Sequence, residues 1–238
     1  MANAGIILQA RVGSTRLPGK VLKPLCGKPM IQWIVERLKR ARIPEVLILA
    51  TSNLEQDRPL VEIAKQMNIP AFQGSESDVL DRYYQCARQF NLQHIVRATG
   101  DNPFVDPEEC DRLIGYYFDK KLDHAIISTS PEDGFPLGVG LEIFSYSALE
   151  KSWREGHAAH HREHVDEYIL ENPEMFRQEK MPAPPEKRAP SVSLTVDTPE
   201  QFSQAECAYK EFLRLNPGGD VNVPWLIEYY EINQKGRS

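Results

Sequence analysis

Short apolar runs alternate with helix-like segments along the first half of this chain. Residues 6–8 and 46–50 are apolar at consecutive positions, which is typical of strands buried on both faces. Helical patterns at 28–38 and 58–67 follow these runs, and Pro29 suits the first turn of the earlier helix. The alternation predicts a three-layer αβα fold in which helices cover both faces of a mostly parallel, Rossmann-like twisted sheet.

The same pattern continues to the end of the chain, and we therefore expect one domain over residues 1–238. Asp78 is placed to cap a helix through residue 87, and Pro199 and Pro224 are placed to begin the last two helices. Further strands are expected at 71–72, 95–98, 124–128, 141–144, 176–181 and 192–196, and further helices at 107–120, 145–155 and 161–171.

A basic loop follows the first predicted strand. No acidic residue appears before Glu36, although the whole chain has a net charge of −6. Glycines and backbone amides can cradle phosphates and arginines can grip their oxygens, so a nucleoside triphosphate fits this loop. The alternative is a solvated basic loop, but open α/β sheets bind ligands at this position. The loop contains Arg11, Gly13, Ser14, Arg16, Gly19, Lys20 and Lys23.

Two familiar phosphate loops do not match. A P-loop has four residues between its glycines and then Lys-Ser/Thr, whereas five residues separate Gly13 from Gly19 and Val21 follows Lys20. Pro18 also removes a backbone amide that such a cradle uses. The Gly-x-Gly-x-x-Gly fingerprint of dinucleotide folds is missing after the strand.

The composition excludes several other classes of function. A pI near 5.6 argues against nucleic acid as a partner. The four cysteines form no metal-spaced pair and no dense disulfide framework, which predicts reduced, buried thiols. The sequence shows no membrane span, and its first residues lack the basic segment of a signal peptide. We therefore expect a cytoplasmic protein with no membrane partner.

Two aspartates lie just beyond predicted strands. Asp101 follows 95–98, and Asp197 follows 192–196. Because parallel strands end at one edge of a sheet, both carboxylates can reach one Mg²⁺, which needs few protein ligands when phosphate oxygens and water supply the rest. Taken alone, each aspartate is more commonly a turn-former or a helix cap.

Four of the six histidines lie within residues 157–164. Helical spacing relates His157, His160, His161 and His164, so a zinc site is conceivable. No known catalytic helix motif is matched, and zinc is therefore the less favoured interpretation.

The loop Ala10-Arg11-x-x-Ser14-Thr15-Arg16-Leu17-Pro18-Gly19-Lys20 resembles the signature loop of the sugar cytidylyltransferases. This superfamily includes the CMP-Kdo synthetases and the acylneuraminate cytidylyltransferases, and the chain looks most like its spore-coat polysaccharide protein F group. The segments around Asp101 and Asp197 look like the metal-aspartate segments of the family, and 74–82 looks like its second nucleotide segment. The resemblance implies a fold of the nucleotide-diphospho-sugar transferase type.

The resemblance also implies roles for individual residues. Arg11, Lys20, Asp101 and Asp197 are expected to be catalytic, with Mg²⁺ held by the two aspartates. Nucleotide binding is expected at Ala10, Arg11, Gly13, Ser14, Arg16, Lys20, Gly74, Ser75, Asp81 and Arg82.

A further subregion, about 130–190, is expected to bind the acceptor and to form a homodimer. Arg162-Glu163-His164-Val165 looks like Arg-Glu-His-Val of the spore-coat group. The expected acceptor-binding residues are Glu142, His161, Arg162, Glu163 and His164. One departure is Gly140, where many relatives carry an aspartate, so the acceptor need not be a typical nine-carbon sugar acid.

These features predict a Mg²⁺-dependent enzyme that transfers CMP from CTP to a sugar or sugar-acid acceptor, releases pyrophosphate and serves surface polysaccharide biosynthesis. CTP, as opposed to another nucleotide, rests on the resemblance. Two alternatives stay open: a phosphorylated or phosphonate small molecule as the acceptor, and a nucleotide-binding protein without turnover.

Overall fold

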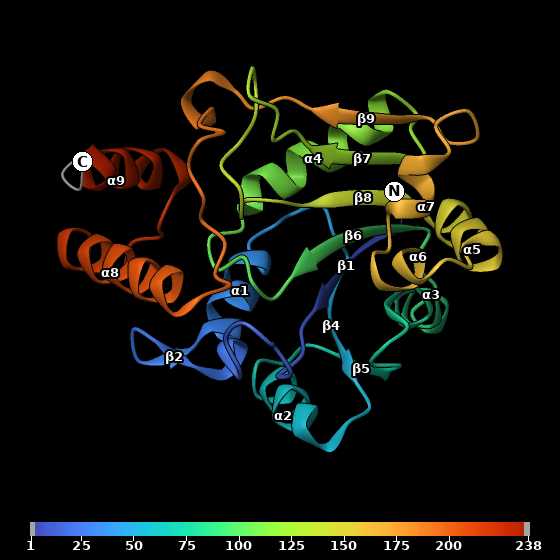
Figure 1. The fold of residues 1–238 in the computed structure, drawn as a ribbon, viewed down its shortest axis with the longest axis horizontal. Helices are drawn as coiled ribbons and strands as arrows, with labels where there is room; N and C mark the ends of the chain where they lie inside the picture. The colour runs from blue at the N-terminus through green and yellow to red at the C-terminus, as the bar shows by residue number, and fades with distance from the viewer. Residues whose placement is uncertain (1–2, 236–238) are drawn as a thin grey trace.

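A computed structural model describes residues 3–235, in which seven strands form one sheet flanked by α-helices (Figure 1). The strands of this sheet are β1 (Ala4–Gln9), β4 (Val46–Ser52), β5 (Ala71–Gly74), β6 (His94–Thr99), β7 (His124–Ile127), β8 (Glu142–Ser145) and β9 (Gln178–Met181), while β2 (Pro24–Leu25) pairs with β3 (Lys28–Pro29). The helices are α1 (Met30–Leu38), α2 (Arg58–Gln66), α3 (Val79–Gln89), α4 (Pro107–Asp119), α5 (Tyr146–Glu155), α6 (Ala159–Glu163), α7 (Glu167–Glu171), α8 (Pro199–Leu215) and α9 (Val223–Lys235).

The strand order is β5-β4-β1-β6-β8-β7-β9. Every neighbouring pair is parallel except the two that involve β8, which runs against both β6 and β7. The prediction of a mostly parallel sheet is confirmed, with one reversed strand. The ends of the predicted domain, residues 1–2 and 236–238, lie outside the described residues.

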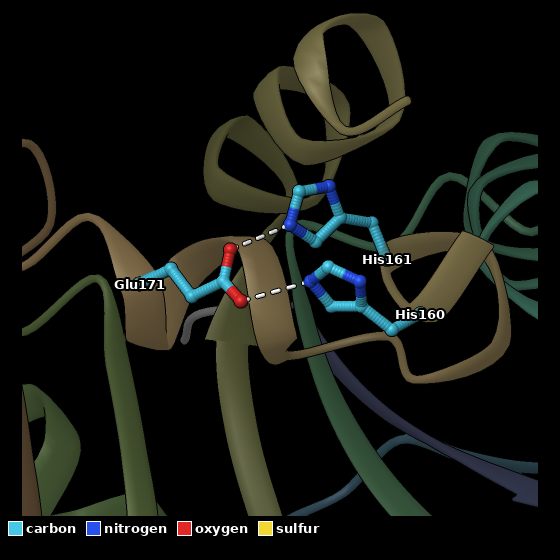
Figure 2. Close-up of side chains that lie close together, drawn as sticks. All are labelled: His160, His161 and Glu171. Atoms are coloured by element: carbon cyan, nitrogen blue, oxygen red, sulfur yellow. Dashed lines mark hydrogen bonds and ion pairs between the residues drawn. The ribbon is translucent and has the colours of Figure 1, made fainter. Parts of the chain in front are cut away.

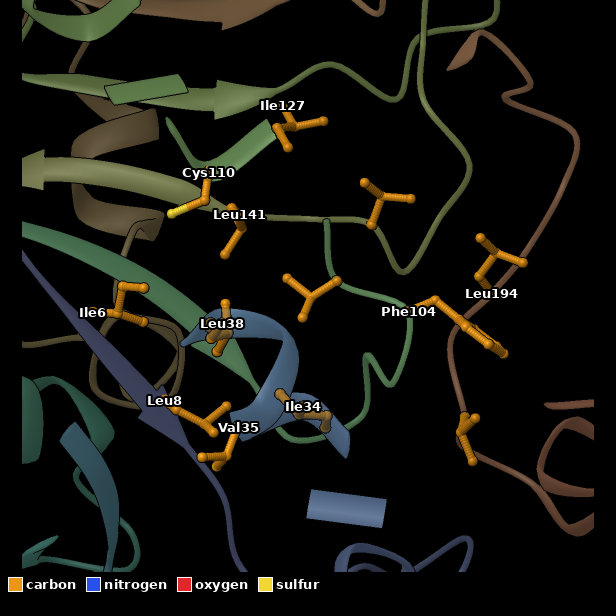
Figure 3. Packing of buried hydrophobic residues seen from close by; sticks show 14 of the residues in the cluster. Ile6, Leu8, Ile34, Val35, Leu38, Phe104, Cys110, Ile127, Leu141 and Leu194 are labelled. Atoms are coloured by element: carbon orange, nitrogen blue, oxygen red, sulfur yellow. The ribbon is translucent and has the colours of Figure 1, made fainter. Parts of the chain in front are cut away.

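Successive side chains of β1 feed two separate cores. Ile6 and Leu8 join the core under α1, α2, α4, α8 and α9, part of which Figure 3 shows. Ile7 points the other way, into the core under α3, α5 and α7. Because the side chains of a strand alternate between faces, a consecutive apolar run buries both faces of the sheet.

The structure departs from two predicted elements. The single helix expected over 161–171 is interrupted, because His164 is extended (φ −113°, ψ 111°) between α6 and α7. Residues 192–196 form no strand beyond one bridge between Leu137 and Ser193. Val192, Leu194 and Val196 are nevertheless buried, so the alternation reflected burial without sheet pairing.

None of the described helices is long and apolar enough to cross a bilayer. The cysteines are free thiols, as expected, but Cys207 is exposed and Cys26 only partly covered, so the prediction of buried thiols is correct for two of the four. The cytoplasmic location stays a prediction.

Candidate active site

A cleft of about 540 Å³ opens at the carboxyl ends of β1 and β6. It lies where the basic loop leaves β1, at the edge where open α/β sheets bind ligands. Of the residues predicted from the sequence, ten line it: Ala10, Arg11, Ser14, Arg16, Lys20, Arg82, Asp101, Glu163, His164 and Asp197. Its other lining residues include Gln9, Thr15, Glu76, Ser77, Val79, Arg97, Thr99 and Gly100.

Lys20 joins the two predicted aspartates. Its Nζ lies 2.8 Å from Oδ1 of Asp197 and 4.0 Å from Oδ2 of Asp101. The same ammonium donates a hydrogen bond to the carbonyl of Val196, and the amide of Val196 donates to the carbonyl of Asp101. This backbone contact holds Asp197 beside the loop after β6. The two carboxylates therefore lie close together, as predicted, although the strand expected at 192–196, on which the prediction rested, does not form.

The basic loop is anchored by the side chain of Asp57, which the sequence analysis did not single out. Asp57 is fully buried, and its Oδ1 accepts a hydrogen bond from the amide of Val12 at 2.6 Å. Its other oxygen accepts the hydroxyl of Ser52 at the end of β4. A buried carboxylate of this kind fixes the backbone of a loop. Nothing local in the sequence distinguishes Asp57 from an ordinary helix-start aspartate.

Arg82 places a buried positive charge at the cleft. Its side chain is 1% exposed, its Nη1 donates to the carbonyl of Ser75, and no ion pair to it occurs among residues 3–235. Burial lowers the pKa of this guanidinium, but arginine keeps its charge. A side chain at Gly74 would come within 2.9 Å of the Arg82 stem, so glycine lets the arginine pack there. An unneutralised buried cation favours an anionic ligand.

Four of the residues predicted to bind nucleotide do not line the cleft: Gly13, Gly74, Ser75 and Asp81. Gly74 and Ser75 support Arg82, and the Ser75 hydroxyl also accepts from the amide of Asp78. Asp81 accepts the indole N–H of Trp153 at 2.8 Å. These contacts position the cleft, and direct nucleotide contacts by these residues stay predictions.

Glu142 belongs to a buried network behind the cleft. Nη1 of Arg97 contacts Glu142 and lies 3.5 Å from Oδ1 of Asp166, and Nε2 of His124 is 3.2 Å from Glu142. Burial alone would raise the pKa of Glu142, but Arg97 and His124 lower it to about 2. Burial and the neighbouring Glu142 raise the pKa of Asp166 to about 7. Arg97 also lines the cleft, and an arginine inside the apolar run 95–98 was the signal that could have identified it.

The predicted acceptor residues around α6 divide into two groups. Glu163 and His164 reach the cleft. Arg162 instead donates from Nε and Nη2 to Asp78 and from Nη1 to the carbonyl of Trp153, and His161 contacts Glu171 at 2.7 Å. Glu142, His161 and Arg162 do not line the cleft. Direct acceptor binding by these three residues stays a prediction.

The match to a known family decides what kind of site this is. Residues 5–216 match the cytidylyltransferase family. The spore coat polysaccharide biosynthesis protein SpsF of Bacillus subtilis is 36% identical over 210 residues, which cover 86% of this chain and 85% of the relative. The chain belongs to the cytidylyltransferase family. It is therefore a nucleotidyltransferase, and the resemblance identified from the basic loop is confirmed.

Solved cytidylyltransferases share the fold over almost the whole chain. A cytidylyltransferase from Leptospira borgpetersenii superposes with a TM-score of 0.88 at 30% identity, covering 99% of this chain and 96% of the other. CMP:2-keto-3-deoxy-manno-octonic acid synthetase, solved in complex with CTP, superposes with a TM-score of 0.67 at 21% identity, covering 89% and 100%. The second match bears on the fold alone.

Proposed function

We propose that this cytidylyltransferase transfers CMP from CTP to a sugar or sugar-acid acceptor with release of pyrophosphate, and that it requires Mg²⁺. The observation that carries the proposal is the meeting of Lys20, Asp101 and Asp197 at one point of the cleft, next to Arg11 and Arg16. A site that only bound nucleotide would not need two carboxylates facing the triphosphate, because they repel it in the absence of a metal ion.

The two carboxylates suit Mg²⁺, which takes a few oxygen ligands from protein and the rest from phosphate and water. Asp101 and Asp197 would hold it, and when bound it supplies positive charge against the phosphate oxygens. An acceptor hydroxyl oxygen attacks the α-phosphorus of CTP and gives its proton to solvent, while the bond from the α-phosphorus to pyrophosphate breaks and its electron pair leaves on pyrophosphate. Lys20 and the two arginines neutralise the charge that develops on that leaving group.

The acceptor side of the proposal rests on Glu163 and His164, which reach the cleft from α6. The similarity to SpsF, whose name places it in spore coat polysaccharide biosynthesis, favours a carbohydrate acceptor and a role in a surface polysaccharide. We also propose that residues 130–190 pair two chains. Light scattering of the purified protein tests that pairing, and a monomer at all concentrations would exclude it.

The deciding experiment follows pyrophosphate release with CTP, UTP, ATP or GTP, with Mg²⁺ or with EDTA, and with a panel of acceptors. The panel contains eight- and nine-carbon sugar acids, neutral sugars and phosphorylated or phosphonate small molecules. We expect release with CTP and a sugar acid only when Mg²⁺ is present. Release with the phosphorylated compounds alone would establish the alternative acceptor. CTP binding with no release from any acceptor would contradict the proposal.

A further inference from the structure

A second cluster of metal-ligand side chains lies on α6 and α7, outside the cleft. Nε2 of His160 is 2.8 Å from Oε1 of Glu171, and Nε2 of His161 is 2.7 Å from Oε2 of the same carboxylate. Figure 2 shows both imidazole rings turned toward this one side chain. The three ligand atoms all lie within 4.8 Å of one another. Two nitrogens and one carboxylate oxygen are thus close enough to be ligands of one ion.

The charge of this cluster is not compensated by a permanently charged side chain. Over residues 3–235, the ion-pair partners of Glu171 are His160 and His161, and no lysine or arginine joins them. The buried group of His124, Glu142 and Asp166 has a similar ligand set, but there Nη1 of Arg97 already contacts both carboxylates. A cation is therefore built into the buried group and is missing from the cluster at Glu171.

The ring of His161 is fixed in the orientation that a ligand needs. Its side chain is 12% exposed, and its ring packs edge-on against Tyr168, with centroids 5.4 Å apart. Its Nε2 faces Glu171, while its Nδ1 is buried without a hydrogen-bond partner among residues 3–235. His160 and Glu171 are half exposed, which leaves one side open for water as a further ligand.

We infer that His160, His161 and Glu171 bind one divalent transition-metal ion of the Zn²⁺ class. Imidazole nitrogens suit Zn²⁺, Ni²⁺, Co²⁺ and Cu²⁺ and disfavour Mg²⁺, which prefers oxygen ligands. With bonds of about 2.0–2.1 Å, ligand atoms on a tetrahedral ion are separated by about 3.3 Å. For the ion to bind, the distances from the two histidine nitrogens to the Glu171 oxygens must therefore lengthen by about half an ångström. The exposed side chains of His160 and Glu171 can supply this movement.

The ion would act on the segment that reaches the cleft. It bridges α6 and α7 across the extended residue His164, where the helix expected from the sequence is interrupted. Glu163 and His164 lie in this junction and line the cleft, so bound metal would hold both side chains in place. Metal binding can be tested separately from the proposed function, because none of the three ligands lines the cleft.

The test uses the full chain without a histidine tag, stripped with a chelator and kept in excess Mg²⁺. Calorimetric titration with Zn²⁺ should give one ion per chain. His160→Ala and Glu171→Gln should each weaken this binding by at least tenfold, since loss of a mere supporting contact to a metal ligand costs about 10- to 100-fold. His157→Ala is the matched control, because this exposed histidine of the same segment is outside the cluster.

A second readout separates binding from damage to the fold. Zn²⁺ should raise the Tm of the wild-type protein and of His157→Ala but not that of His160→Ala, since a ligand that binds only the native state stabilises it. Two results would overturn the inference. One is no Zn²⁺ bound by the wild-type chain, and the other is equal binding by His160→Ala and wild type.

Discussion

On one wall of the cleft the charged side chains pair with one another where the cleft is lined, whereas on the other most of them pair away from the cleft, inside the protein. The first, here called the loop wall, consists of residues 10–20 with Asp101 and Asp197. The second, here called the helical wall, consists of Arg97 with Glu142 and Asp166, and of α3 and α6 joined by Asp78 and Arg162. Arg16 has a side chain that is 66% exposed, while the side chain of Arg97 is 17% exposed.

Charged side chains of the loop wall can contact a ligand, whereas most of those in the helical wall stabilise the fold. An exposed ion pair contributes little to stability, whereas removing one partner of a buried pair leaves an uncompensated charge and is costly. We therefore expect substitutions in the loop wall to lower turnover at nearly constant stability, and substitutions in the helical wall to lower stability first. The predictions below begin with the largest expected effects on turnover and then turn to effects on stability.

Asp101→Asn and Asp197→Asn should each reduce turnover by about 1,000-fold, because the charge stabilisation supplied by a bound metal ion amounts to several kcal/mol. The double variant should be hardly worse than either single one, since both serve one ion. Pyrophosphate release at several Mg²⁺ concentrations checks this. If the losses of turnover in the two single variants multiply in the double variant, the two aspartates do not share a metal ion.

Lys20→Ala should reduce turnover by about 100-fold, the effect of removing a group worth ~3 kcal/mol in the transition state. Lys23→Ala is the control, because this lysine of the same loop lies over the ring of Phe202 and does not line the cleft. Comparable activity in the two variants would remove Lys20 from the mechanism.

Arg97→Met should lower the free energy of unfolding by about 3 kcal/mol, because it leaves Glu142 and Asp166 buried without their cation. Urea denaturation measures the change. Adding Glu142→Gln to this variant should recover part of the loss, since it removes the carboxylate left unpaired. Full stability in Arg97→Met would contradict the contrast between the walls.

Arg162→Ala should lower the free energy of unfolding by about 1–2 kcal/mol, the usual contribution of hydrogen bonds to a charged partner. If Arg162 acts through Asp78, adding Asp78→Asn to Arg162→Ala should lower the free energy of unfolding only slightly further, because asparagine still caps α3. The acceptor KM at saturating CTP is the second readout. A large rise in KM with unchanged stability would instead place the guanidinium on the acceptor.

The last prediction concerns how stability depends on pH in the wild type and in Asp166→Asn. The folded pKa of Asp166 is about 7, above the ordinary value near 3.9, so the native state binds its proton more tightly. This contribution to stability is complete below about pH 4 and is lost as the pH rises toward 7. The wild type should therefore lose stability between pH 5 and 8 relative to Asp166→Asn, as urea denaturation at each pH can show. Parallel profiles would show that Asp166 does not titrate in this range.

The loop wall could be predicted because its information is local or topological. The segment from Ala10 to Lys20 is contiguous in sequence, and Asp101 and Asp197 could be placed from the strand-like patterns that precede them. The strand predicted at 192–196 does not form, but the backbone hydrogen bond between Val196 and Asp101 places Asp197 in the same position.

The helical wall could not be predicted because it depends on contacts between distant residues. Arg162 pairs with Asp78, which is 84 positions away, and this contact turns it from the cleft. The periodicity of 161–171 predicted a single helix, and Val165 and Ile169 of this segment are buried in the core. It could not show that the helix ends before His164. It also could not show that His160 and His161 contact Glu171.

The ion pair between Lys20 and Asp197 joins two distant parts of the sequence, and the metal-binding role that we propose for Asp197 gives this separation a consequence during synthesis. A ribosome delivers the chain from its amino end, and the strands β1, β4 and β6 are complete long before residue 197 emerges. Until then Lys20 has no Asp197 to meet, and the basic loop can attract nucleotides without the second carboxylate of the site. On the proposed mechanism, a chain that has not yet been made past residue 197 can bind nucleotide without turnover. Turnover would begin only when Asp197 has been made and has folded back onto the loop that follows β1.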